Sequence, residues 1–155
     1  MRRAATIIAT FGYTGFFPFA PATFASAVFC AAYYWVPGGH WLVHPAVAGL
    51  TLVASIPLST FMEKEHGEDP SCVVIDEIVG MQVILVGASV GLSSLAAAFL
   101  LFRFFDILKP FPIDRSQKLP GGWGIVIDDF LAGIYTRAAL FLISLLWPSI
   151  GGFGL

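Results

Sequence analysis

Residues 78–102 form a run of 25 residues without a charged side chain, which limits the folds open to this chain. A helix that crosses the hydrocarbon core of a bilayer needs about 20 apolar residues. The whole chain shares this character, with 57% hydrophobic residues and a mean hydropathy of +0.84. Only 12% of its residues are charged, whereas soluble domains carry about 25%. We therefore predict an integral membrane protein, and the net charge of −2 argues against nucleic acid as a partner.

Hydropathy and turn residues divide the chain into helices and loops. Residues 36–41 predict a turn, 63–71 a polar loop and 109–124 a loop rich in proline and glycine. We predict an all-α fold in a single domain over residues 1–155, a polytopic membrane bundle of about four to five helices, some of them short or interfacial. The candidate helical segments are residues 24–36, 44–62, a long tract 73–108, and 125–147.

The long tract is either one crossing or a hairpin that turns at residues 87–94, where glycine and serine interrupt the apolar run. The hairpin, with arms 72–89 and 92–108, leaves the loops 37–45 and 87–94 on one side without lysine or arginine. This asymmetry follows the positive-inside rule with a cytoplasmic N-terminus, so we favour the hairpin. The basic residues on the cytoplasmic side are then Arg2, Arg3, Lys64, Arg103, Lys109, Arg115 and Lys118.

Five carboxylates lie near the cytoplasmic ends of three helices in the hairpin arrangement. Ionisable side chains in membrane helices are costly, and they mark functional sites by default. An all-oxygen ligand set without histidine or cysteine at matching spacing favours Mg²⁺. The alternative is that these acids cap helices or form ion pairs with Arg103, Lys109 or Arg137. The five acids are Asp76, Glu77, Asp106, Asp128 and Asp129.

Cations and polar side chains near these acids predict a phosphate site, although each has a structural alternative. Arg103 and Asp106 are three residues apart and can pair on one helical face. Lys109 is either a phosphate clamp or a lysine that extends to the membrane surface. Thr23 is a candidate N-cap, where free backbone N–H groups bind anions, or an ordinary cap. His66 could donate a proton, bind metal or be a solvated side chain.

Four segments resemble the phosphatidylglycerophosphatase A family: GYTGFFPFAPATFAS, HGEDPSCVVIDEIVGM, FRFFDILKPFPI and GGWGIVIDDFLAGI. The resemblance implies an enzyme of the bacterial inner membrane. Together with the predicted helices and the charge asymmetry, it predicts a multi-pass protein whose active site faces the cytoplasm. It also implies a Mg²⁺-dependent phosphatase that converts phosphatidylglycerophosphate to phosphatidylglycerol and inorganic phosphate. The family commonly has Pro-Gly-Thr where this chain has Pro21-Ala22-Thr23.

The resemblance agrees with the residue roles predicted from the sequence. The five acids would hold Mg²⁺ and, with Lys109, carry catalysis, either by activating a water or by attack of a carboxylate on phosphorus. Substrate binding would fall to Thr23, Arg103, Lys109 and His66.

An ion-coupled or proton-coupled transporter is the alternative function, and it would spread its acids through the depth of the membrane. The oligomeric state and the number of metal ions are open at this point.

Overall fold

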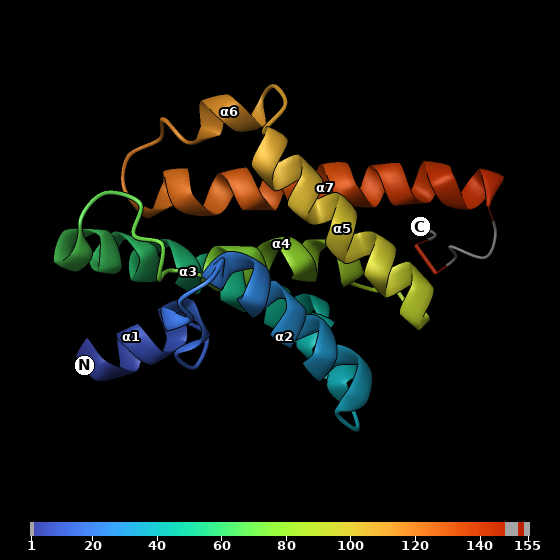
Figure 1. Cartoon of the computed structure of the whole chain (residues 1–155), viewed down its shortest axis with the longest axis horizontal. Helices are drawn as coiled ribbons and strands as arrows, with labels where there is room; N and C mark the ends of the chain where they lie inside the picture. Colours follow the sequence, from blue (N-terminus) through green and yellow to red (C-terminus); the bar gives the residue numbers. More distant parts are fainter. Residues whose placement is uncertain (1, 148–151, 154–155) are drawn as a thin grey trace.

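The computed structural model of the chain describes residues 2–147, 152 and 153. Within these residues the regular structure is entirely helical, as predicted, and the longer helices form one bundle (Figure 1). The elements in chain order are α1 (Arg2–Ala9), η1 (Thr14–Phe16), α2 (Pro21–Trp35), η2 (Gly39–Val43), α3 (Pro45–His66), α4 (Ile75–Leu85), α5 (Leu92–Leu108), α6 (Ile113–Ser116) and α7 (Gly122–Leu146).

Helix boundaries follow local chemistry more closely than hydropathy. Helices α2 and α3 begin at Pro21 and Pro45, because proline fixes a helical φ and needs no hydrogen bond at the first position. Helix α3 also runs beyond the predicted end at residue 62, since glutamate and lysine favour helices as well as apolar residues do. It ends at His66, before Gly67 with a φ of 96°.

The predicted hairpin is confirmed, but its first arm is shorter than expected. Helix α4 ends at Leu85, and α5 begins at Leu92 and turns back toward α6 (Figure 1). The predicted arm 72–89 is wrong, because α4 has 11 residues and a length of about 16 Å at ~1.5 Å per residue. Residues 72–74 lie outside the helix, where Val74 N donates a hydrogen bond to Ala9 O at 3.0 Å.

Helix α4 is the centre of the bundle. All of its residues except Val83 are buried, and it packs against α2, α3, α5 and, most extensively, α7. The two helices approach closely at Gly80 and Gly133, where a Cβ added to Gly133 would lie 2.7 Å from Gly80 O. This close crossing places the start of α4 beside the second turn of α7.

The C-terminal end of α4 is fixed by Arg137 of α7. The Arg137 Nη1 atom donates hydrogen bonds to Ile84 O at 2.8 Å and to Val86 O at 2.6 Å. The last carbonyls of a helix have no partner within the helix, so these bonds satisfy groups that would otherwise be unpaired. Arg137 therefore binds the opposite end of α4 from Asp76 and Glu77, and these two hydrogen bonds join it to backbone carbonyls rather than to the acids.

Helices α3 and α7 are each long and apolar enough to cross a membrane. Figure 1 shows the N-terminus, the end of α3 and the start of α7 at one end of the bundle, on the left. Large side chains such as Leu50, Val53 and Leu145 are exposed along these helices. Outward-facing apolar side chains are unfavourable in water and suit contact with lipid, so these helices fit a protein that lies in a membrane.

Candidate metal and phosphate site

Three helices bring their polar residues together at one place in the bundle. Asp76 and Glu77 lie in the first turn of α4, and Asp128 and Asp129 lie in the second turn of α7. These four side chains are 3–7% exposed. The last turn of α5 adds Asp106, which is half-buried. The predicted convergence of the five acids is therefore present in the fold.

The carboxylates form two overlapping groups of three, within each of which one oxygen per residue lies within 4.8 Å of the others. The inner triad consists of Asp76, Glu77 and Asp129. The outer triad consists of Asp106, Asp128 and Asp129. Asp129 thus belongs to both groups, which makes it the central acid of the site.

Two cations pair with the outer triad. Lys109, which follows α5 in a left-handed conformation, places its Nζ 2.6 Å from Asp128 Oδ2. Burial opposes the charge of Lys109, but the hydrogen bond to Asp128 and the nearby carboxylates outweigh burial and raise its pKa. Arg103 Nη1 lies 2.9 Å from Asp106 Oδ2, an ion-pair contact. The buried Arg103 Nε has no hydrogen-bond partner within the described chain, so this donor remains for a ligand.

The residues present fit a bound Mg²⁺ ion. The buried atoms Asp76 Oδ1 and Glu77 Oε2 accept no hydrogen bond from any described residue, although buried polar atoms are rarely without a partner. The five carboxylates also outnumber Arg103 and Lys109, and like charges this close need a proton or a cation between them. Carboxylate oxygens are the ligands that Mg²⁺ prefers.

Helix capping does not account for these acids. No side chain in the described part of the chain caps α4, although Asp76 and Glu77 lie in its first turn. The first turn of α7 contains no acidic residue, and Asp128 and Asp129 lie beyond it. Asp128 Oδ1 does accept a hydrogen bond from Asp129 N at 3.0 Å, but this bond lies inside the helix. The metal interpretation therefore explains more of the geometry than the capping interpretation.

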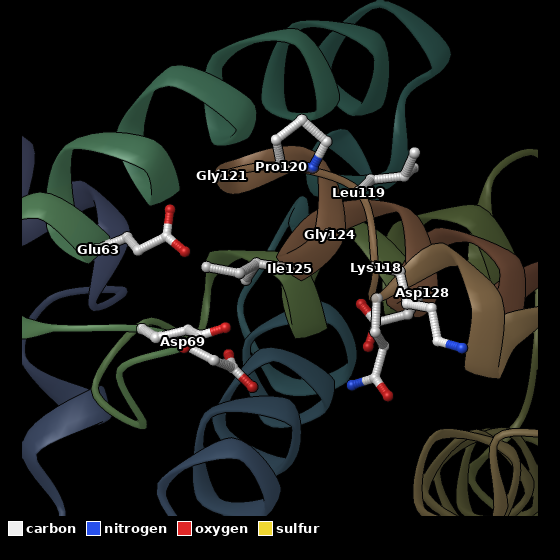
Figure 2. Close-up of a pocket in the computed structure, with 11 residues that line it drawn as sticks. Glu63, Asp69, Lys118, Leu119, Pro120, Gly121, Gly124, Ile125 and Asp128 are labelled. Carbon is white, nitrogen blue, oxygen red and sulfur yellow. The ribbon is translucent and has the colours of Figure 1, made fainter.

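Two adjoining cavities give access to the cluster. The inner cavity has a volume of about 380 Å³ and is lined by all five acids, Arg103 and Lys109. The vestibule, of about 420 Å³, lies between the loop after α3 and the loop before α7. Figure 2 shows Glu63 and Asp69 on one side of the vestibule and Asp128 on the other. Asp69, Ile125 and Asp128 line both cavities, so the two are neighbours.

Two predicted binding residues are not brought to the cluster. The expected N-cap at Thr23 is wrong, because α2 begins at Pro21 after Ala20, and Thr23 lies within the first turn. Pro21 and Ala22 line the inner cavity, whereas Thr23 lines neither cavity. His66 is exposed at the end of α3, with Nδ1 3.3 Å from Met62 O, and it also lines neither cavity.

Sequence reasoning missed that the predicted polar loop 63–71, whose first residues lie in α3, forms a wall of the vestibule. Glu63, Glu68 and Asp69 line that cavity. Their clustering in the sequence was visible, but it gave no sign that the loop before α7 would lie opposite them.

Comparison with known proteins gives one family and several relatives. A model of the phosphatidylglycerophosphatase A family matches residues 7–144. A Bacteroides thetaiotaomicron protein provisionally named as a phosphatidylinositol-3-phosphatase is 38% identical over 131 residues, covering 79% of this chain and 82% of the relative. No solved structure shows a significant match.

Two relatives carry the name phosphatidylglycerophosphatase A. The protein from Haemophilus influenzae is 49% identical over 77 residues, which cover 48% of this chain and 47% of the relative. The protein from Escherichia coli is 31% identical over 138 residues, which cover 87% of this chain and 80% of the relative.

Proposed function

The chain belongs to the phosphatidylglycerophosphatase A family, and from this premise we propose that it hydrolyses phosphatidylglycerophosphate to phosphatidylglycerol and inorganic phosphate. The observation that supports this activity best is the buried cluster of five carboxylates beside Arg103 and Lys109. A phosphoryl group needs positive charge around its oxygens during transfer, and this site combines ligands for a cation with two fixed cations.

We assign the metal-binding role to the five acids of the inner and outer triads. Bound Mg²⁺ would supply charge stabilisation for the phosphoryl oxygens and lower the pKa of a water nucleophile. The chain's own residues hold and orient the phosphate: Lys109 stays protonated beside Asp128, and Arg103 offers a buried donor on the same side.

The inner cavity suits a substrate that remains in the bilayer. It is lined by Ile107 of α5, which is 74% exposed, and by Pro21 of α2. A lipid headgroup can enter between these helices while its acyl chains stay in the membrane. The vestibule opens among polar loop residues, so we assign it to water entry and phosphate release.

The acids do not support the transporter alternative. An ion path through the membrane would place acids at several depths, preferably in broken helices. Here the five acids gather where the start of α4, the end of α5 and the early part of α7 meet. Surface chemistry on a headgroup explains this placement better.

The substrate can be tested with the protein purified in detergent with Mg²⁺. Phosphatidylglycerophosphate, phosphatidylinositol 3-phosphate and phosphatidic acid would be supplied separately, and phosphate release measured for each. We expect release from phosphatidylglycerophosphate at the highest kcat/KM. An absence of release from this lipid would overturn the proposed function, and a preference for phosphatidylinositol 3-phosphate would reassign the substrate.

Lys109→Met should lower kcat/KM by about 100-fold, because one charged donor to the phosphoryl oxygens is lost. Phosphate release from phosphatidylglycerophosphate measures this effect. Lys64→Met is the matched control, since Lys64 is exposed on α3 and lines neither cavity. Equal rates for the two variants would remove Lys109 from the mechanism.

We place the chain in the bacterial inner membrane with the carboxylates on the cytoplasmic side. A membrane-impermeant maleimide should then label Ser89→Cys from outside, because Ser89 is exposed between α4 and α5. It should not label Lys64→Cys until the membrane is opened. Both variants need Cys30 and Cys72 replaced first. The reverse labelling pattern would invert the topology.

A further inference from the structure

The inner and outer triads differ in how their charge is balanced. Two acids of the outer triad already pair with protein cations, Asp128 with Lys109 and Asp106 with Arg103. Within the described chain no lysine or arginine comes within ion-pair distance of an inner-triad acid. The outer triad is also more open, because Asp106 is half-buried while the inner acids are buried.

The buried carboxylate oxygens without a hydrogen-bond partner in the described chain both belong to the inner triad. Asp76 Oδ1 and Glu77 Oε2 are buried without a hydrogen-bond partner in the described chain, and both residues line the inner cavity at 7% exposure. A cation at this position would bind these oxygens and relieve the repulsion between three buried carboxylates. Among the described residues no lysine or arginine forms an ion pair with these three acids, so the inner triad favours a cation in the absence of any other ligand.

A cation in the outer triad would have to compete with Lys109 and Arg103 for its ligands. To bind Asp128, the cation would have to displace Lys109, whose Nζ lies 2.6 Å from Asp128 Oδ2. To bind Asp106, it would have to displace Arg103. A phosphate in the inner cavity changes this balance, since its oxygens attract Lys109 and Arg103 and can themselves bind a cation. The two carboxylates are then released to a metal ion.

We propose that the site holds two divalent cations that share Asp129 and bind in order. The inner triad takes one ion without substrate, and the outer triad takes a second ion only together with a phosphate. This inference rests on the proposed function for the identity of the phosphate, which belongs to the lipid headgroup. Pairs of metal ions about 3.5–4 Å apart are a common arrangement for displacement at phosphorus.

The stoichiometry can be measured without turnover, with Mn²⁺ alone and then Mn²⁺ with inorganic phosphate. The full chain in detergent, stripped of metal, would be titrated by calorimetry and electron paramagnetic resonance. We expect one Mn²⁺ per chain without phosphate. With phosphate we expect two, and the resonance should show the broadening of two exchange-coupled ions.

Variants assign the two positions. Asp76→Asn and Glu77→Gln should each weaken the first Mn²⁺ by at least about tenfold, as expected for a lost ligand. Asp106→Asn should leave the first ion within about threefold and remove the second. Lys109→Met should allow a second Mn²⁺ without phosphate, because its competing ammonium is gone. Thermal unfolding without metal checks each variant's fold, and the same concentration of added Mn²⁺ should stabilise Asp106→Asn more than Asp76→Asn.

Several results would overturn this order. One is the binding of two Mn²⁺ ions with equal affinity in the absence of phosphate. Another is a number of bound Mn²⁺ ions that does not change when phosphate is added. A third is that Asp106→Asn weakens binding of the first Mn²⁺ as much as Asp76→Asn does. Failure of the proposed function is distinct, because it appears as no phosphate release from phosphatidylglycerophosphate while the Mn²⁺ stoichiometry holds. Normal metal-dependent hydrolysis with one of the contrary binding results would overturn this inference alone.

Discussion

Asp129→Asn is expected to lower the rate of phosphatidylglycerophosphate hydrolysis by about 10³-fold, equivalent to about 4 kcal/mol of transition-state stabilisation. Asp129 is the one acid that belongs to both triads, so its loss weakens every metal position of the site. Asparagine has nearly the same shape, and it removes one of several buried like charges. We therefore expect the variant to fold, with helix content and thermal unfolding close to those of the parent chain.

Asp114→Asn is the matched control for this variant. Asp114 is exposed in the short helix α6 and belongs to neither triad, so this variant makes the same chemical change away from the site. Its rate should stay within about twofold of the parent chain, as expected for a surface substitution away from the site. A well-folded Asp129→Asn protein with near-normal hydrolysis would show that the cluster does not carry catalysis.

Gly133→Ala is expected to reduce hydrolysis by about 100-fold while leaving all five acids in the chain. The added Cβ would lie 2.7 Å from Gly80 O, so α4 and α7 must move apart at this crossing. The inner triad takes Asp76 from α4 and Asp129 from α7, and a displacement of about 1 Å at a reacting centre can cost roughly 100-fold in rate. The overpacking should also lower stability by about 1–3 kcal/mol.

Gly49→Ala separates this effect from a general intolerance of alanine. Gly49 lies in α3, and a Cβ built there meets no atom within 4 Å. Activity and thermal unfolding temperature should both be preserved in this variant. If Gly133→Ala retained full activity while Gly49→Ala behaved as expected, the close crossing of α4 and α7 would not be what positions the acids.

The main outline of the fold and site could be predicted because charge in a membrane protein is so restricted. The loops 37–45 and 87–94 contain no lysine or arginine, and that asymmetry favoured a turn between α4 and α5 over a single crossing. Once the turn was placed, Asp76 and Asp106 had to lie at the same end of the bundle. The convergence of the acids follows from topology, so it needed no knowledge of side-chain packing.

Local geometry and distant contacts could not be predicted in the same way. Thr23 has the chemistry of an N-cap, but Pro21 starts α2 earlier and leaves Thr23 inside the first turn. His66 continues α3 rather than turning into the site. Arg137 binds Ile84 O and Val86 O, a partnership between residues about 50 positions apart that no sequence periodicity reveals.

The most direct measurement is phosphate release from phosphatidylglycerophosphate by the purified chain before and after metal removal. The rate with Mg²⁺ would be compared with the rate after EDTA treatment and again after Mg²⁺ in excess of EDTA is restored. Because the acids of both triads are ligands rather than proton carriers in this account, EDTA should abolish release and Mg²⁺ should restore it. Full activity in EDTA would contradict the account.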